Sequence, residues 1–397
     1  MRQAFLIKTL LTIFFSGIIS LAPGQEIDPD QLGGRVNIIS TAVPFLEIAP
    51  ESRGGAMGNT GVAISPDVNS QHWNPAKYAF IQNESGVALS YTPWLRKLVD
   101  DINLYYLAGY KRLDDLQTVS ASLRYFSMGE VIFTQEANPQ AGIAVQPNEF
   151  AIDAAYSRVL SDNFSGSVAF RYIRSDLQMG LAGTGYDHYQ PGNSFAADLA
   201  FYYNNELEIG DYESQLNAGL NISNIGSKIS YDGNTEQFIP TNLRLGTSVT
   251  SNIDDYNQIT LNVDLNKLLV PTPDTTSTDT NEGLFQSDDV SVIAGMFQSF
   301  GDAPGGLEEE LQEINISAGV EYLYNQQFAI RAGYFHEHEN KGNRKFATAG
   351  IGLKFNMLTV DASYIIPVVQ NNPLANTVRF TLGLDLAELR GNGNEED

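Results

Sequence analysis

The sequence predicts an all-β protein, a 14-stranded antiparallel transmembrane β-barrel of a bacterial outer membrane. Three observations predict this fold class. Side chains alternate between apolar and polar with a period of two residues, the alternating segments are mostly 9 to 11 residues long, and the connections between them alternate between short and long. These features are typical of strands that face lipid on one side and a polar interior on the other.

The first 24 residues predict a cleaved secretory signal peptide. Arg2 and Lys8 make a basic start, and residues 10–21 are mostly apolar and carry no charge. Small residues follow at Ala22 and Gly24, in the positions that a signal peptidase reads. A membrane anchor is the alternative, but the apolar run is shorter than the roughly 18 residues that a spanning helix needs. We therefore expect an exported protein.

The strands follow in order after residue 83. In the last of them, Phe380 and Leu382 alternate with Arg379 and Thr381, so that one face is apolar and the other polar. Fourteen such segments are expected, at 84–94, 102–112, 117–126, 149–159, 164–173, 194–204, 212–222, 241–250, 256–265, 313–323, 328–336, 345–355, 358–366 and 376–386. Most have the length that a tilted strand needs to cross a bilayer, and bacterial barrels have an even number of strands.

The connections between the expected strands predict the orientation of the barrel. Joins that follow even-numbered strands are at most seven residues long, whereas four of the seven joins after odd-numbered strands exceed fifteen residues. Outer-membrane barrels have short periplasmic turns and longer extracellular loops. We therefore expect residues 84–386 to form the barrel, with both termini in the periplasm and an acidic periplasmic tail at 387–397.

The composition excludes several classes of function. The formal net charge of −24 argues against a nucleic-acid partner, because phosphate binding needs clustered Lys and Arg. The absence of Cys excludes disulfides and thiolate ligands. His336 and His338 share a strand face, but no third ligand is evident, so a solvated loop is favoured over a metal site. We expect no cofactor and no catalytic residue. A lipid deacylase that uses His188 or His336 remains an open alternative.

The polar faces of the expected strands carry charges of both signs. The basic ones are Arg124, Arg171, Arg244, Arg331 and Arg379, and the acidic ones are Asp153, Asp198, Asp264, Asp361, Asp385 and Glu321. An ion-selective pore would favour one sign at its constriction. Mixed signs predict a filled interior whose side chains pair with one another.

Residues 25–83 form a polar, glycine-rich segment that precedes the first strand and can sit inside the barrel as a hatch. The stretch 55–63 contains Gly58, Asn59 and Gly61, and a second motif reads Trp73-Asn74-Pro75-Ala76. No Gly-Lys-Ser/Thr is present, which excludes a phosphate loop. The two motifs resemble the N-terminal hatch of FadL-type outer-membrane transporters, a family of 14-stranded barrels.

Within this group the chain resembles the PorV family, outer-membrane shuttle proteins of the type IX secretion system. The likeness is carried by residues 41–46, 69–77 and 372–380. The resemblance implies a barrel that binds the C-terminal signal domain of secreted cargo at a large outer-membrane translocon barrel. It also implies transfer of that cargo to a cell-surface attachment complex with a sortase-like protease. No covalent chemistry is implied, and the surroundings are outer-membrane lipid and lipopolysaccharide.

The long connection 266–312 offers the strongest candidate for partner binding. Ser287 and Asp288 are expected to cap a helix, and residues 307–313 to form a second short helix. The apolar candidates around the first helix are Leu284, Phe285, Val290, Ile293, Met296, Phe297 and Phe300. Such a helix either packs on its own barrel rim or presents a docking surface to another protein, with help from the loops 127–148 and 174–193.

A second function remains open, namely FadL-like transport of hydrophobic small molecules. It requires an apolar pocket inside the barrel and an opening in the wall. The charged lumen argues against a wide apolar channel, whereas the hatch and the kink-prone stretch Ser127-Met128-Gly129 keep this function open.

Overall fold

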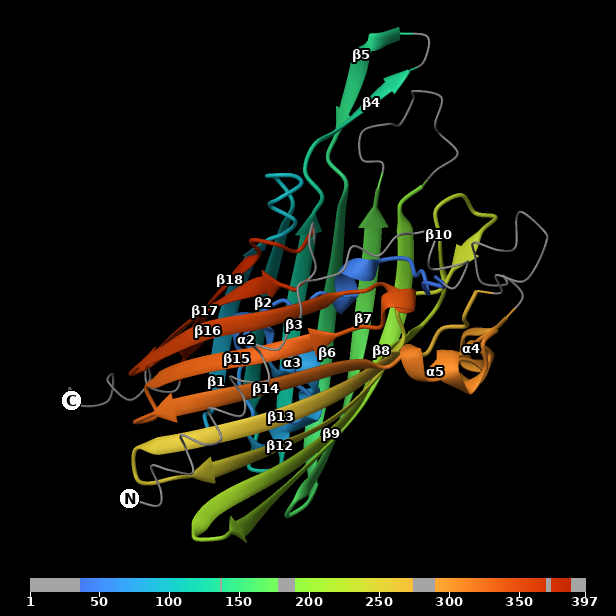
Figure 1. Ribbon diagram of the computed structural model, residues 1–397. Coiled ribbons are helices and arrows are strands. Elements are labelled where there is room, and N and C mark those ends of the chain that lie inside the picture. The colour runs from blue at the N-terminus through green and yellow to red at the C-terminus, as the bar shows by residue number, and fades with distance from the viewer. Residues whose placement is uncertain (1–35, 136–137, 178–189, 274–289, 369–372, 387–397) are drawn as a thin grey trace.

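The computed structural model describes residues 36–135, 138–177, 190–273, 290–368 and 373–386. The predicted signal peptide and the predicted tail at 387–397 lie outside the described residues. Within them, fourteen antiparallel strands form one closed barrel (Figure 1). The strands are β1 (Ser85–Pro93), β2 (Asn103–Arg112), β3 (Gln117–Ser127), β6 (Asn148–Ser161), β7 (Phe164–Asp176), β8 (Gly192–Ile209), β9 (Tyr212–Gly226), β12 (Asn242–Asn252), β13 (Asn257–Leu268), β14 (Asn315–Tyr324), β15 (Phe328–His336), β16 (Lys345–Phe355), β17 (Leu358–Pro367) and β18 (Val378–Asp385).

The barrel confirms all fourteen predicted strands. Each strand pairs with its neighbour in the sequence, and β1 closes the barrel by pairing with β18 from Gly86↔Asp385 to Tyr91↔Phe380. Short turns lie at one end, such as the two residues between β16 and β17, and long connections at the other. We call these the turn end and the loop end. Closure leaves no strand edge unpaired, which a sheet in hydrocarbon requires.

The wall has apolar residues outside and polar residues inside. In β3, Val119 and Leu123 are 37% and 40% exposed on the outer face, whereas Ser120, Ser122 and Arg124 are buried in the interior. The alternation in the sequence therefore separates the lipid side from the lumen, as predicted.

Aromatic side chains mark the expected edges of the lipid-facing band. Near the loop end, Tyr91, Tyr105 and Tyr125 lie in a row with ring centroids 5.3 and 6.3 Å apart. Phe150, Tyr172 and Phe195 continue this row across the next three strands of the barrel. Near the turn end, Tyr324 and Phe355 are exposed. Such girdles are typical of the two membrane interfaces of outer-membrane barrels.

Two small hairpins at the loop end were not predicted. β4 (Val131–Gln135) pairs with β5 (Asn138–Val145), and this hairpin projects beyond the barrel in Figure 1. The second consists of β10 (Ile229–Ser230) and β11 (Glu236–Gln237). Both lie within connections, where no membrane face imposes a period of two on the sequence. β8 also runs through Ile209, five residues beyond its predicted end, because residues 205–209 still pair with β9.

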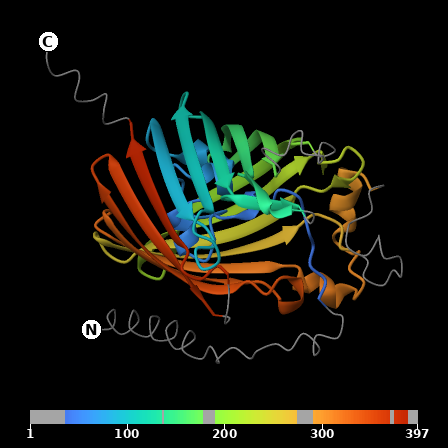
Figure 2. The same cartoon turned by 90° about the horizontal axis from the view of Figure 1, so that it is seen from above.

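The N-terminal part of the chain lies inside the ring of strands, as its blue colour shows in Figure 2. We call residues 42–81 the interior segment. It contains η2 (Pro44–Glu47), α2 (Ser52–Ala56), α3 (Ser70–Trp73) and η3 (Pro75–Phe80). The remaining helices, α4 (Val292–Gln298), η4 (Glu339–Lys341) and α5 (Leu307–Gln312), belong to loop-end connections.

No helix among the described residues is both long and apolar enough to cross a membrane.

The described chain begins at the loop end and finishes at the turn end. The Asn37 side chain donates to the carbonyl of Pro273 and to Glu309 Oε1, both at 3.0 Å, and its backbone N–H donates to Asn340 at 3.0 Å. All three partners belong to loop-end connections. Asp385, in contrast, ends β18 at the turn end. The location of residues 1–35 lies outside the described residues, so a periplasmic N-terminus stays a prediction.

The position of residue 36 can be tested by labelling, because the chain contains no Cys. Val36 is 41% exposed beside the loop-end connections, and Asn356 lies in the turn between β16 and β17. We expect Val36→Cys to react with a membrane-impermeant maleimide on intact cells, and Asn356→Cys to react only after the outer membrane is permeabilised. The reverse pattern would show that the loop end faces the periplasm.

Candidate functional site

The helix α4 carries the predicted partner-binding residues at the loop end. Its N-cap is Ser291, whose hydroxyl accepts from the Ala294 N–H at 3.4 Å. The predicted caps were therefore wrong: the helix starts at Val292, and Ser287 and Asp288 lie outside the described residues, as do Leu284 and Phe285. Propensity alone could not choose among these three residues, because both Ser and Asp can cap a helix.

One side of α4 packs on its own barrel rim. Gly295 is buried, and a Cβ atom there would lie 3.0 Å from the ring of Pro271 and 3.1 Å from Phe238. The glycine thus allows a close approach of the helix to the rim. Val290 and Met296 are partly buried.

The opposite side of α4 is open to solvent. Ile293 and Phe297 of α4, and Phe300 just after its end, are 56%, 76% and 54% exposed. We call these three residues the α4 face. The helix therefore packs on the rim with one side and exposes apolar side chains on the other, which agrees with the first sequence interpretation. A docking surface for another protein stays a prediction. Exposed apolar side chains that follow helical spacing are typical of a surface that contacts another molecule.

The second helix, α5, is fixed by ion pairs rather than by apolar packing. Lys267 lies 3.0 Å from Glu310 and 2.5 Å from Glu313, and Lys341 lies 3.0 Å from Glu313. These contacts join α5 to the end of β13 and to the β15–β16 connection. Leu307 and Leu311, one turn apart, are 76% and 60% exposed. The sequence predicted this helix. Its exposed leucines were not predicted, although their i, i+4 spacing was a signal.

The interior segment is held by glycines that allow close approach. Gly58 adopts φ 71°, and a Cβ there would lie 2.5 Å from the Tyr334 carbonyl oxygen. A Cβ on Gly61 would lie 2.1 Å from the Trp73 indole. Asn59 also adopts a positive φ, of 64°. The glycines of the hatch motif therefore bring the backbone against β15 and against Trp73.

The Trp73-Asn74-Pro75 motif links the interior segment to the wall. Glu51 Oε1 accepts from the Trp73 indole N–H at 2.8 Å and from Gly54 N–H at 2.7 Å, which caps α2. The Asn74 side chain donates to the carbonyls of Val62 and Phe201 at 3.1 and 2.9 Å. The Pro75 carbonyl accepts from Ser157 at 2.7 Å. The structure thus places both predicted motifs, Gly58, Asn59, Gly61, Trp73, Asn74 and Pro75, inside the ring of strands. Their role as a hatch stays a prediction.

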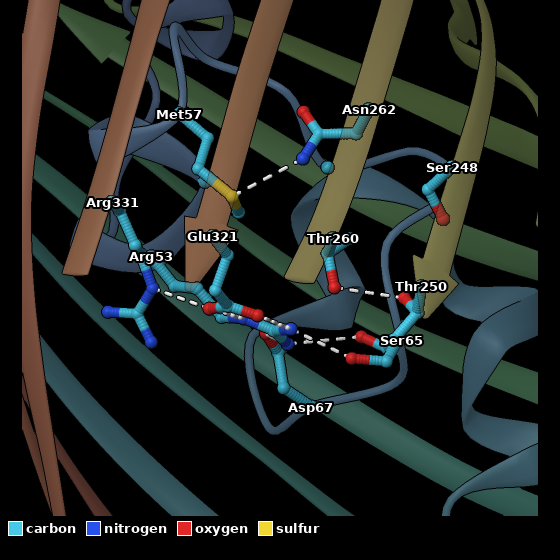
Figure 3. Close-up of polar contacts among 12 residues, drawn as sticks. Arg53, Met57, Ser65, Asp67, Ser248, Thr250, Thr260, Asn262, Glu321 and Arg331 are labelled. Carbon is cyan, nitrogen blue, oxygen red and sulfur yellow. Dashed lines mark hydrogen bonds and ion pairs between the residues drawn. The ribbon is translucent and has the colours of Figure 1, made fainter. Parts of the chain in front are cut away.

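Arg53 forms the main ionic contact between the interior segment and the wall (Figure 3). Its guanidinium lies 3.0 Å from Glu321 of β14 and 3.0 Å from Asp67 of the interior segment. Glu321 also binds Arg331 of β15 at 2.6 Å. In the same view, the Asn262 amide points toward the Met57 sulfur, 3.4 Å away. Buried charges of both signs are therefore paired across the lumen.

The predicted lumen charges divide into two groups. Arg171 pairs with Asp153 and Asp198, both at 2.9 Å, and Arg331 with Asp361 at 2.5 Å, which confirms the expected charge pairs. Arg124, Arg244 and Arg379 instead donate to backbone carbonyls of the interior segment, at Leu46, His72 and Ala49. Asp264 accepts from the N–H groups of Gly61 and Val62. Side chains of the wall thus form hydrogen bonds with the backbone of the interior segment.

The lumen near the loop end contains an apolar cluster that the interior segment occupies. Phe45 and Leu46 of η2 are buried among residues that include Leu104, Phe126 and Ile173 of the wall. The rings of Phe45 and Phe126 are stacked with centroids 6.2 Å apart. The chain itself therefore fills the most apolar part of the described lumen.

The stretch 336–339 differs from the predicted solvated loop. Glu337 is buried and binds Arg344 at 2.6 Å, while the His338 ring accepts from the Asn340 N–H and caps η4. Across the part of the chain that the structure describes, no group of three or more His, Cys, Asp or Glu side chains could hold a metal ion. His188 lies outside that part.

The closed 14-stranded barrel, its apolar outer wall and its filled polar lumen define an integral β-barrel protein of the outer membrane. The family model described as type IX secretion system protein PorV matches residues 32–275, more than half of the chain. The chain belongs to this family, and it is thus an outer-membrane component of type IX secretion. No curated protein matches it.

The chain is similar to several solved structures, among them two toluene transporters and a FadL homologue. The chain is similar to the toluene transporter TodX of Pseudomonas putida, with 12% identity over 83% of this chain and 95% of that one and a TM-score of 0.45. It is similar to the toluene transporter TbuX of Ralstonia pickettii, with 9% identity over 84% and 97% and a TM-score of 0.43. A FadL homologue of Pseudomonas aeruginosa gives 11% identity over 88% and 99% and a TM-score of 0.40.

The Arg53 contact generates a testable prediction on stability. In Arg53→Met, Glu321 and Asp67 lose a buried partner, and removing one member of a buried pair typically costs about 3–5 kcal/mol. We expect the free energy of unfolding to fall by that order in urea titrations of the protein in detergent. Arg112→Met is the matched control, because its partner Asp115 is fully exposed. A loss of equal size in both variants would contradict the role given to Arg53.

Proposed function

We propose that this barrel binds the C-terminal signal domain of secreted cargo at the translocon and carries it to the surface attachment complex. The proposal rests on membership of the PorV family together with one observation, the exposed α4 face at the loop end. The partners are the large translocon barrel, the cargo signal domain and the attachment complex with its sortase-like protease. In this proposal the barrel itself catalyses no reaction.

The arrangement of the chain supports a binding role over a channel role. The interior segment occupies the lumen and is bound to the wall through Arg53, Asn74 and Asp264. A large partner that approaches the loop end can therefore contact only the connections, which include the exposed α4 face. The helix α5 follows α4 in the same connection, and its ion pairs with Lys267 and Lys341 fix this part of the connection on the rim.

The α4 face can be tested with a charge substitution. Phe297→Glu places a carboxylate at the most exposed position of the face, where contact with an apolar partner would require its desolvation. We expect co-purification of cargo and translocon from outer membranes to drop by about 30-fold, the equivalent of the roughly 2 kcal/mol that defines a binding hot spot. Quantitative mass spectrometry of the purified complexes measures the change.

The matched control for this experiment is Leu98→Glu. Leu98 is 64% exposed in the connection between β1 and β2, so the substitution adds the same charge at the loop end away from α4. Heat-modifiable migration on a gel reports whether each barrel is folded. Unchanged cargo recovery with folded Phe297→Glu would rule out the α4 face as the docking surface, and loss in both variants would point to a general charge effect.

The second candidate function, transport of hydrophobic small molecules, is favoured by the apolar cluster around Phe45. Since the interior segment fills that cluster, transport would require the segment to move. We expect the purified protein in planar bilayers to show no steady conductance and liposomes that contain it to take up toluene no faster than empty ones. Uptake that exceeds empty liposomes, and rises further in Phe45→Ala, would favour transport over cargo binding.

A further inference from the structure

A cavity of about 260 Å³ lies at the loop end between the start of the described chain and the rim of the barrel. It is separate from the α4 face and from the apolar cluster in the lumen. Its walls come from the residues just before the interior segment, from η2, from the facing ends of β13 and β14, and from the β15–β16 connection. Five of its lining side chains are charged, namely Glu47, Glu313, Glu337, Lys341 and Arg344.

Four of these five charges are paired with one another or with their neighbours. Arg344 lies 2.6 Å from Glu337 and donates a second hydrogen bond to it at 2.9 Å. Lys341 lies 3.0 Å from Glu313 and 2.6 Å from Glu309. The donors of both cations are thus directed at carboxylates that they already neutralise.

Glu47 is the exception. Its carboxylate makes no ion pair and no hydrogen bond with any described residue, and its side chain is half-buried in the wall of the cavity. Burial raises the pKa of Glu47 above its ordinary value, while the charges of Arg344 and Arg244, beyond ion-pair distance, oppose that shift. A half-buried carboxylate without a protein donor is partly desolvated, and a bound cation that donates hydrogen bonds would compensate for the lost hydration.

The remaining walls of the cavity indicate what kind of cation fits. Ile38, Ile39 and Leu268 provide an aliphatic surface beside the carboxylate. No cluster of three metal-ligating side chains occurs among the described residues, so the site lacks the convergent oxygens that a bare divalent ion needs. The volume is below the roughly 300 Å³ at which drug-sized pockets begin, and an amino-acid side chain matches it better.

We propose that this cavity binds an alkylammonium or alkylguanidinium group, with Glu47 as its counter-ion and the isoleucines and Leu268 against its alkyl chain. Two sources share this chemistry. One is a Lys or Arg side chain of a protein that approaches the loop end, and the other is a small free amine. The site does not depend on the proposed cargo function, and its test needs no secretion partner.

The test is isothermal titration calorimetry on the full-length protein in detergent. The probes are Nα-acetyl-lysine methylamide, its uncharged analogue Nα-acetyl-norleucine methylamide, and 1,5-diaminopentane. We expect the lysine probe to bind at least about tenfold more tightly than the norleucine probe, because only the first supplies charge-assisted hydrogen bonds. Tighter binding of the lysine probe than of diaminopentane would identify a protein side chain as the source, and the opposite order would identify a free amine.

Two variants and one control decide the outcome. Glu47→Gln keeps the shape but removes the charge, and it should abolish the preference for lysine over norleucine. Ile38 is 49% exposed, so a larger side chain there should not disturb folding. Ile38→Trp should narrow the cavity and weaken the binding of both amine probes. Glu308→Gln removes an exposed charge of α5 outside the cavity and should leave all affinities unchanged. Equal binding of lysine and norleucine probes to the unmodified protein, or binding unaffected by Glu47→Gln and Ile38→Trp, would overturn the proposal.

Discussion

The structure depends on one constraint: the backbone N–H and C=O groups of the strands have no water to bind in the hydrocarbon of a membrane. Pairing of β1 with β18 satisfies the last of these groups and closes the barrel. Closure creates an outer surface in lipid and an enclosed lumen. Every second residue therefore turns inward, and the polar side chains that a soluble protein would expose become buried.

Burial of so many polar groups creates a second requirement, which the interior segment meets. The wall side chains need partners, and the segment supplies carbonyls to Arg124, Arg244 and Arg379, amides to Asp264 and a guanidinium to Glu321. The wall in turn buries Phe45 of the segment among Leu104, Phe126 and Ile173. The barrel and its contents therefore stabilise each other, and the surfaces available to large partners are those outside the lumen.

The loop end combines rigid anchoring with exposed apolar groups. Ion pairs of Lys267 and Lys341 fix α5, and the rim packing of Gly295 fixes α4, while Phe297 and Leu307 remain in solvent. Exposed apolar side chains on a fixed support lose little conformational freedom on binding, which favours affinity. This combination agrees with a protein whose proposed role is to hold a folded domain and release it again.

The sequence by itself determined the number of strands, their order, the side chains that face lipid, and the alternation of turns and loops. These properties are local, because a period of two and a strand length set by the bilayer are visible within about ten residues. Only the tertiary structure decided which charges meet: Arg53 and Glu321 are separated by 268 residues, and Asn37 reaches Glu309 across 272. It also decided that Asn37 lies at the loop end, that Ser291 caps α4, and that Glu47 stays without a partner. Such contacts depend on how distant segments are brought together, and no local pattern in the chain encodes them.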